Sequence, residues 1–278
     1  TTEIYTLSLH DALPIFHPLL DKAAALIREG RLVAFPTETV YGLGANALDP
    51  SAVRRIFEAK GRPSSSPLIV HVSSVEMARA LAAEWPETAA LLTERHWPGP
   101  LTLVVPKRPS IPDEVTAGLP TVGLRMPAHP LALALIEAAG CPIAAPSANR
   151  FTELSPTSAE HVRKSLGPAV DLILDGGSTP VGIESTVLAL TPRPLLLRPG
   201  MIAQDEIEAL IGPVATLSSP VAGAHPAPGL HARHYSPRTP LILVRQGVLP
   251  GSGRGAYLKH GDSMPAEPAA YAAALYST

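Results

Sequence analysis

The chain has little that would support a disulfide framework or a metal centre. Its single cysteine, Cys141, lies in the apolar stretch AAGCPIAAP, so neither an internal disulfide nor a multi-cysteine metal site can form. A small packed residue explains Cys141 better than a reactive nucleophile, because no base lies near it in the sequence. The His-Glu-x-x-His and Cys-x-x-Cys spacings are also absent, so any Mg²⁺ is expected to be held mostly by phosphates and water.

Aromatic residues and excess charge are scarce as well. Aromatics make up 4% of the residues, and the formal net charge is −2. These values argue against a row of stacking rings and against a global basic field of the kind that recruits nucleic acid. An anion site therefore has to be a local cluster of cations inside a cleft.

Long apolar runs are missing too. No stretch approaches the ~20 residues of a membrane span, and no secretory signal peptide is recognisable. We therefore expect a cytoplasmic location and no membrane partner. Apolar residues at 46% and charged residues at 17% are typical of a folded chain.

Strands and helices alternate along most of the sequence. LLDKAAALIREG has helical spacing within an expected helix over 17–29, and RLVAFPT is a buried-strand pattern that follows it. DPSAVRRIFEAKG predicts a second helix that starts at an Asp-Pro-Ser cap and stops at a glycine. The whole pattern predicts an α/β fold with a twisted, open, mixed sheet flanked by helices.

The predicted domain organisation has four parts. Residues 1–16 resemble sequencing-adaptor read-through and predict a non-native leader, with a native arm as the alternative. A catalytic domain is expected over 17–213 and a linker rich in proline and small residues over 214–240. The remainder, 241–278, opens with the strand-like LILVRQG and predicts the truncated start of a C-terminal domain.

Small hydroxyls follow the first buried strand in AFPTETVYGLGAN. Thr37 and Thr39 stand at a strand end, where they would make good ligands for a polar small molecule. The Gly-x-Gly after them would let a backbone approach closely, although an ordinary turn explains it equally well.

Two cations stand two residues apart in EAKGRPSSSPLIVH. Pro63 favours an extended Arg62, and residues two apart in an extended segment point to the same side. Lys60 and Arg62 could therefore converge on one anion, with arginine as a bidentate fork. The alternative is a solvated helix end, where cations are favoured by the helix dipole. His71, at the end of the next strand, could be catalytic or structural.

Three further corners repeat this chemistry. Arg125 ends an apolar strand and would be costly to bury without an anion. Ser147 and Asn149, two apart in APSANR, could face one ligand. Ser185 precedes a strand and Arg198 ends another. Because ligands of open α/β sheets bind where strand ends cluster, the corners predict one polar, cationic pocket for a nucleoside triphosphate and an amino acid.

Seven motifs occur in order: FPTETVYGLGANA, KGRPSSSPLIVHV, WPGPLTLVV, TVGLRMPAHP, PSAN, GIESTVLAL and LLRPG. Together they resemble the YrdC-like threonylcarbamoyl-AMP synthase family over about residues 19–212, and PAPGLHARHYSPRTPL resembles the interdomain linker of its longer, two-domain branch. The resemblance implies that L-threonine, bicarbonate and ATP are condensed, with Mg²⁺, to threonylcarbamoyl-AMP and pyrophosphate. The product would supply downstream tRNA threonylcarbamoyl transferase proteins, and a weak contact with double-stranded RNA is a further expectation.

The resemblance also implies roles for particular residues. Lys60 and Arg62 would be catalytic, by stabilising negative charge together with Arg198. The threonine side would consist of Thr37, Thr39, His71, Arg125 and Ser185. The ATP side would consist of Arg62, Ser66, Thr121, Ser147, Asn149 and Arg198, with His234 and Tyr235 of the linker folded over it.

Two departures from the family pattern stand out. The family usually has Asn where this chain has Ser66, and the linker usually carries Met-Lys-Tyr where this chain has Leu230, His231 and Ala232. Two alternatives to the synthase remain open at this point. One is a non-catalytic RNA- or nucleotide-binding module of the same fold, and the other is carbamoyl-adenylate formation on a different acceptor.

Overall fold

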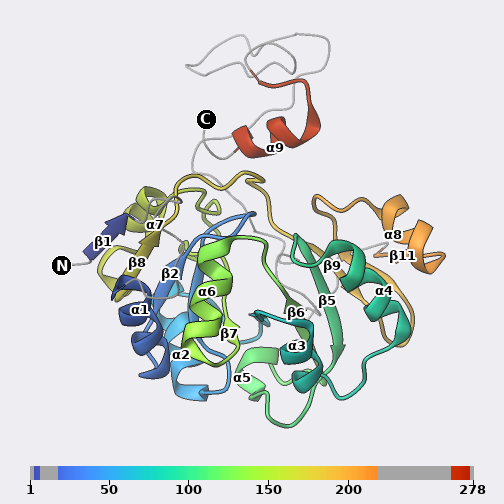
Figure 1. The fold of residues 1–278 in the computed structure, drawn as a ribbon, viewed down its shortest axis with the longest axis horizontal. Helices are drawn as coiled ribbons and strands as arrows, with labels where there is room; N and C mark the ends of the chain where they lie inside the picture. Colours follow the sequence, from blue (N-terminus) through green and yellow to red (C-terminus); the bar gives the residue numbers. More distant parts are fainter. Residues whose placement is uncertain (1–2, 7–17, 218–263, 276–278) are drawn as a thin grey trace.

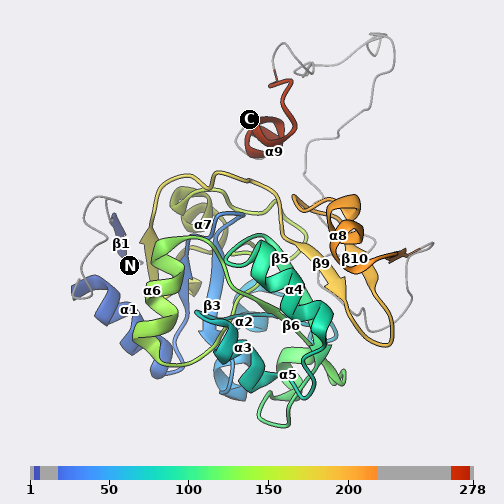
Figure 2. The same cartoon turned by 45° about the vertical axis from the view of Figure 1, so that its right-hand side comes forward.

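The computed structural model describes residues 3–6, 18–217 and 264–275. Figure 1 shows a twisted sheet with helices on both sides, and the same layers are visible after a turn of 45° in Figure 2. This confirms the predicted α/β class. None of the described helices is long and apolar enough to cross a membrane. The predicted linker and the strand expected at 241–247 lie almost wholly outside the described residues, so the domain boundaries stay predictions.

The described strands form one mixed sheet of eleven strands in the order β1-β8-β2-β3-β7-β4-β6-β5-β9-β10-β11. Parallel pairs such as β4–β6 and β5–β9 alternate with antiparallel pairs such as β4–β7 and β5–β6. The strands are β1 (Glu3–Thr6), β2 (Val33–Phe35), β3 (Gly42–Asn46), β4 (Ile69–His71), β5 (Leu101–Pro106), β6 (Thr121–Arg125), β7 (Ile143–Ala144), β8 (Leu172–Asp175), β9 (Thr186–Ala189), β10 (Leu195–Arg198) and β11 (Ala215–Thr216).

The helices between them begin and end at the signals in the sequence. Asp49 caps α2 by accepting a hydrogen bond from Ser51 N at 2.8 Å, and α2 stops at Gly61, which is left-handed with φ 62°. The described helices are α1 (Pro18–Arg28), α2 (Pro50–Lys60), α3 (Val75–Leu81), α4 (Glu87–His96), α5 (Asp113–Thr116), α6 (Pro130–Ala139), α7 (Ala159–Leu166), α8 (Gln204–Ile211), α9 (Pro268–Leu275) and the short 3₁₀ helix Gly167–Ala169.

Alternation along the strands divides the core into two sides. Val33 and Phe35 of β2 pack against α1 and α6 on one side. Ala34 of β2 and Val70 of β4 belong to the larger core on the other side, with α2, α3, α4, α5, α7 and α8. The ring of His71 meets the ring of Phe35 edge-on, with 6.1 Å between the centroids. Ile69 and His71 of β4 therefore lie on the same side of the sheet as Phe35, α1 and α6.

The Gly-x-Gly sequence is part of strand β3 and is not a turn. Its first glycine, Gly42, also lines the pocket of the candidate site. A Cβ on Gly44 would lie 2.7 Å from Phe35 Cε1 and 2.8 Å from Ile143 Cγ2. The glycines are therefore needed for packing, because only a residue without a side chain leaves room for the Phe35 ring. β3 pairs antiparallel with both β2 and β7.

Residues 3–6, which we left out of the predicted fold, form strand β1. They pair in parallel with Leu172–Asp175 of β8 at the edge of the sheet. Strand pairing of this kind uses main-chain groups, which is why the missing side-chain periodicity did not reveal it.

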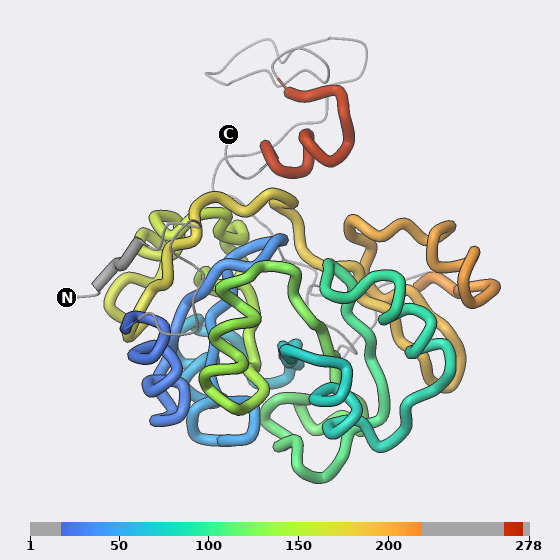
Figure 3. The backbone as a smooth tube through the Cα atoms, viewed as in Figure 1, coloured from blue at the N-terminus to red at the C-terminus, as the bar shows by residue number. Residues whose placement is uncertain are grey.

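The segment between β8 and β9 runs over the loop that follows β2. Val181 N donates to Glu38 O at 2.9 Å, and Gly182 N donates to Thr39 O at 3.0 Å. On its other side Gly182 meets α9, because a Cβ there would lie 2.7 Å from Ala272 O. Figure 3 shows the red tube of α9 above this yellow segment. The segment thus connects the Thr37–Thr39 corner to α9.

Candidate functional site

A pocket that is open to solvent gathers most of the predicted strand-end residues. It lies on the side of the sheet that carries Ile69 and His71. Eight of the predicted site residues line it: Thr37, Thr39, Arg62, His71, Arg125, Ser147, Ser185 and Arg198. The prediction that separate corners form one polar, cationic pocket is confirmed for these eight.

The two threonines after β2 form a small hydrogen-bonded corner. Thr37 Oγ1 donates to Val40 O at 2.6 Å and lies 2.9 Å from Thr39 Oγ1. Because the hydroxyl of Thr37 has a single proton, Thr39 is the donor between the two. The lone pairs of Thr39 Oγ1 are then available to accept a hydrogen bond from a ligand in the pocket.

Arg125 has the anion partner that its burial requires. It sits at the end of β6 with 4% of its side chain exposed, and its Nη2 lies 2.7 Å from Glu38 Oε1. Glu38 Oε2 accepts a hydrogen bond from Ala128 N at 3.1 Å, and Arg125 Nε donates to Gly99 O at 3.3 Å. Glu38 is not among the residues that line the pocket, so it supports the guanidinium from behind.

His71 lies beside Arg125 on the neighbouring strand, at the same register position. It is 3% exposed, and among the described residues its Nδ1 has no hydrogen-bond partner. Burial, with the nearby charge of Arg125, lowers the pKa of His71 to about 3. The imidazole is therefore neutral at physiological pH and can accept or donate a hydrogen bond in the pocket.

Ser185 and Arg198 form the opposite wall with Glu184. Ser185 Oγ lies 2.8 Å from Thr102 Oγ1 and accepts a hydrogen bond from Arg198 Nη2 at 3.1 Å. Arg198 Nη1 is paired with Glu184 Oε2. The other carboxylate oxygen of Glu184, Oε1, accepts a hydrogen bond from Ser155 Oγ at 2.9 Å. Glu184, unlike Glu38, lines the pocket.

Lys60 and Arg62 do not share one side of an extended segment, and that prediction is wrong. Lys60 is the last residue of helix α2, and the left-handed Gly61 turns the chain before Arg62. Lys60 Nζ donates to the backbone oxygens of Ser147 and Asn149, and Lys60 does not line the described pocket. Burial, together with the nearby charge of Arg62, lowers its pKa well below the usual lysine value.

Arg62 reaches the pocket and also braces the loop that follows it. Its Nη2 donates to Ser66 Oγ at 2.5 Å and to Pro67 O at 3.0 Å. Ser66, at the family's asparagine position, is thus held by Arg62 and lies outside the lining of the pocket.

Two further predicted site residues, Asn149 and Thr121, do not line the pocket. The amide nitrogen of Asn149 donates to Arg150 O at 3.0 Å and to Glu153 O at 2.8 Å, so this side chain shapes its own loop and does not face the ligand of Ser147. Thr121 lines a second, small hollow together with Thr102 and Ile69. Because Ile69 lines both hollows, the second one adjoins the pocket.

Some candidates fall outside the structure, and some site residues escaped the sequence analysis. His234 and Tyr235 lie outside the described residues. Ile69, Ala145 and Pro146 line the pocket without any polar signature. Only the strand alternation that places Ile69 on the side of His71 could have identified one of them. The roles assigned to the candidate residues stay predictions.

Comparison with known proteins identifies the family. The family of Sua5, YciO and YrdC, described as "Telomere recombination", matches residues 25–200, which is more than half of the chain. The chain belongs to this family. The C-terminal domain of threonylcarbamoyl-AMP synthase matches residues 202–278, so the Sua5/YciO/YrdC match is followed directly by the domain of the longer branch.

Relatives within the Sua5/YciO/YrdC family are similar over most of this chain. Threonylcarbamoyl-AMP synthase of Pyrococcus abyssi is 55% identical over 80% of this chain and 66% of the relative. The protein of the same name from Bacillus subtilis is 49% identical over 87% and 71%. The solved structure of Pyrococcus abyssi Sua5 complexed with L-threonine matches with a TM-score of 0.80 and 52% identity, over 85% of this chain and 69% of that one. The chain thus spans about two thirds of the length of these relatives.

A metal centre built by the protein itself does not fit the described residues. Among them no three His, Cys, Asp or Glu side chains come together in a way that could hold an ion. The two carboxylates at the pocket, Glu38 and Glu184, are paired with arginines. Mg²⁺ that accompanies ATP would have to be held by phosphate oxygens and water, and no step below depends on it.

Proposed function

We propose that the chain is an L-threonylcarbamoyladenylate synthase, which joins L-threonine, bicarbonate and ATP into threonylcarbamoyl-AMP and pyrophosphate. The observation that carries the proposal is the gathering of hydroxyls, one imidazole and three arginines in the lining of one pocket. In the proposed arrangement, one end of the pocket contains Arg125 with the hydroxyls and the imidazole, and the other end contains Arg62 and Arg198. The names of the relatives and the threonine complex of one of them support this assignment.

The first end suits a small hydroxylated amino acid. Arg125 can take the carboxylate of threonine in a charge-assisted hydrogen bond. Thr39 Oγ1 has lone pairs for the amino group, since Thr39 donates its own proton to Thr37. The neutral His71 and the hydroxyl of Ser185 can bind the remaining polar atoms without adding charge. We assign threonine to this end.

The second end suits a triphosphate. Arg62 and Arg198 supply delocalised charge with fixed geometry, and Ser147 adds a hydroxyl. In the reaction a carbamate oxygen of threonine attacks the α-phosphate, and the two arginines stabilise the charge that develops on the phosphate oxygens and on the leaving pyrophosphate.

In this scheme Lys60 is a positioning residue that does not contact the substrates. Its side-chain nitrogen donates to two backbone oxygens of the Ser147–Asn149 turn, and so keeps Ser147 at the nucleotide end. The product would be passed to tRNA threonylcarbamoyl transferase proteins, and Mg²⁺ would accompany ATP.

The direct test is release of pyrophosphate from ATP by this chain with and without each co-substrate. We expect release only when threonine and bicarbonate are both present. Arg62→Ala and Lys60→Ala should each lower the rate by at least tenfold. A surface variant, Glu160→Gln, should leave it unchanged because Glu160 pairs only with Arg163 and Lys164 on α7.

Other outcomes would contradict the proposal in distinguishable ways. Salt-sensitive RNA binding without threonine-dependent turnover would identify a binding module. A clear preference for another acceptor over threonine would identify a different carbamoyl-adenylate synthase. Some use of serine would not, because one methyl group discriminates by only ~1–3 kcal/mol.

A further inference from the structure

The proposed reaction contains a proton transfer that none of the groups assigned so far performs. The α-amino group of threonine is an ammonium at neutral pH and has no lone pair for attack on carbon. One proton must leave it before the carbamate can form. The inference below therefore rests on the proposed function and asks which side chain takes that proton.

The described lining of the pocket offers few bases. Its titratable side chains are Arg62, His71, Arg125, Glu184 and Arg198. Arginine does not accept a proton in proteins. His71 is an unsuitable acceptor because its burial and the charge of Arg125 keep its pKa near 3. Glu184 is the remaining candidate among these residues.

Glu184 lines the pocket and connects residues assigned to its two ends. It directly precedes Ser185, which is assigned to threonine, and its Oε2 is paired with Arg198, which is assigned to the nucleotide. Ser155 Oγ donates to Oε1 at 2.9 Å and fixes the plane of the carboxylate. Of its side chain, 13% is exposed. A carboxylate at this position would repel the phosphates of a bound nucleotide. This unfavourable charge indicates that Glu184 has a function in the reaction.

We propose that Glu184 is the general base that takes a proton from the α-ammonium group of threonine once the phosphates of the nucleotide have replaced it as the partner of Arg198. The exchange makes the carboxylate a better proton acceptor, because it loses its cationic partner and gains a phosphate anion nearby. Its remaining charged neighbours are Lys60 at the end of α2, which senses the charge of Glu184, and Arg62 and Arg125 in the pocket wall.

The proton and electron count of the step closes. The ammonium gives one proton to Glu184, which becomes a carboxylic acid, and the freed amine lone pair forms the N–C bond to bicarbonate. The amine then loses a second proton, and the carbon loses oxygen as water, so that amine and bicarbonate give carbamate and water. A carbamate oxygen attacks the α-phosphate, the bond to pyrophosphate breaks, and Glu184 returns its proton to solvent when the products leave.

The arrangement of Glu38 shows why the other carboxylate does not compete. Glu38 lies outside the pocket lining, where it is held by Arg125 and by Ala128 N. It holds an arginine in place, whereas Glu184 faces the space that the ligands enter.

The test compares the full chain with Glu184→Gln, and with Glu153→Gln as a matched control. Glu153 also contributes to the field at Lys60, but it bonds Ser165 and does not line the pocket. Threonine-dependent pyrophosphate release is measured between about pH 6 and pH 10, across the range in which α-amines titrate. We expect Glu184→Gln to lower kcat/KM for threonine at neutral pH by about 10²–10⁴-fold, and the deficit to shrink as pH rises.

A second readout uses 4,4,4-trifluorothreonine, whose amine is less basic and already partly deprotonated at neutral pH. The ratio of trifluorothreonine to threonine turnover should be at least tenfold higher in Glu184→Gln than in wild type, because the missing base matters less. Calorimetric binding of a non-hydrolysable ATP analogue should be retained or tightened. If Glu184→Gln does not fold, Glu184→Asp is tested in its place. We expect Glu184→Asp to have a lower kcat than wild type and to lose activity at acidic pH as wild type does, because it retains a carboxylate.

Two results separate this inference from the proposed function. An active wild type together with a Glu184→Gln variant whose pH profile and substrate ratio match wild type overturns the role of Glu184 alone. A wild type with no pyrophosphate release that depends on threonine and bicarbonate overturns the proposed function itself.

Discussion

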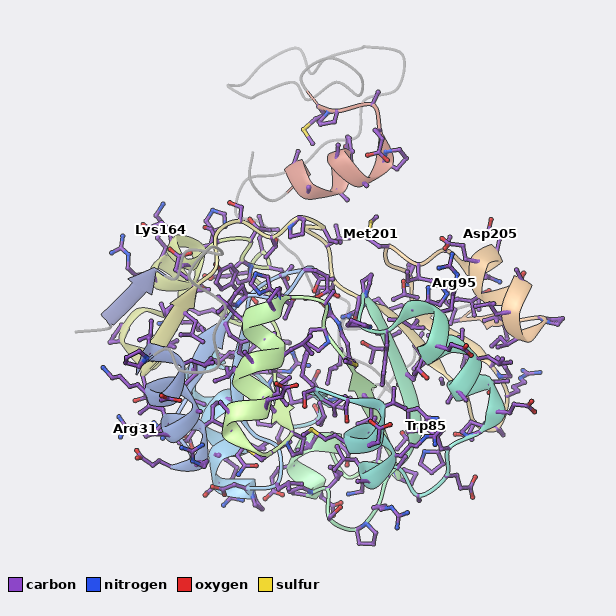
Figure 4. All side chains as sticks on the ribbon, in the orientation of Figure 1. Arg31, Trp85, Arg95, Lys164, Met201 and Asp205 are labelled. Atoms are coloured by element: carbon purple, nitrogen blue, oxygen red, sulfur yellow. The ribbon has the colours of Figure 1, made fainter. Side chains whose placement is uncertain are left out.

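The two arginines at the ends of β6 and β10 differ from those on the molecular surface. Arg31 and Lys164 project outward from the edge of the molecule (Figure 4), and their ion pairs are open to solvent. Arg125 and Arg198 are almost fully buried, and each is paired with a carboxylate from a distant strand-end loop. Buried pairs of this kind are costly to break, because the remaining charge has no water to replace its partner.

The Glu38–Arg125 pair yields a stability prediction. Glu38→Gln should lower the free energy of unfolding by about 3–5 kcal/mol, since it leaves the guanidinium buried without its anion. Urea denaturation measures the change. Glu160→Gln on the exposed face of α7 removes a solvent-screened pair and should leave the urea midpoint unchanged within error. Equal losses for the two variants would contradict the assigned burial.

At this scale the sequence predicted which residue types would be needed and missed how their side chains are used. Arg125, Ser185 and Arg198 could be assigned to the pocket because each stands at a strand end. The side chain of Asn149 turns to its own loop, where its amide donates to Glu153 O. Lys60 could not be placed, because its side-chain nitrogen donates to backbone oxygens of a loop far away in sequence. A local pattern contains no information on such long-range partners.

At the scale of elements, β3 links packing to the site. Gly44 leaves room for the ring of Phe35, and the edge of Phe35 meets His71. The strand escaped prediction because two glycines in five residues resemble a turn. Its place between β2 and β7 is set by pairing on both sides, which overrides the weak strand propensity of glycine.

We expect Gly44→Ala to destabilise the fold by about 1–3 kcal/mol, since a Cβ would overlap Phe35 and Ile143. It should also raise the KM for threonine, because a displaced Phe35 presses on His71. The double variant Gly44→Ala with Phe35→Leu should be more stable than the sum of the single changes predicts, as measured by urea denaturation. Simple additivity would show that the two residues do not compete for space.

For the molecule as a whole, the buried histidines predict sensitivity to acid. Burial is the main cause that lowers the pKa of His71, His96 and His129. For His71 the unfolded chain binds a proton below about pH 6.5, while the folded chain does not until about pH 3. Stability therefore falls as pH drops through this window, by up to about 1.4 kcal/mol per pH unit for one such histidine.

Urea unfolding at a series of pH values checks this expectation. His71→Gln should show a shallower loss of stability between about pH 6.5 and pH 4.5 than wild type, because one proton-binding difference is gone. The same slope in both proteins would mean that His71 is protonated in the folded state.

The sequence predicted the α/β class and the single pocket, because alternation and strand-end residues are local signals. It did not predict the edge strand β1, which depends on main-chain pairing with a strand more than 160 residues away. The segment 37–40 and the segment 177–184 are also joined by backbone hydrogen bonds, which leave no mark on the sequence.

Gly182 carries a consequence for communication along the chain. Its amide is bonded to Thr39 O, and its Cα lies against the backbone of Ala272 and Ala273. We expect that a ligand which restrains Thr39 also restrains the backbone against which α9 packs. Because thermodynamic coupling is reciprocal, a partner that binds α9 would then change the affinity of the pocket by the same factor by which the ligand changes the affinity for that partner.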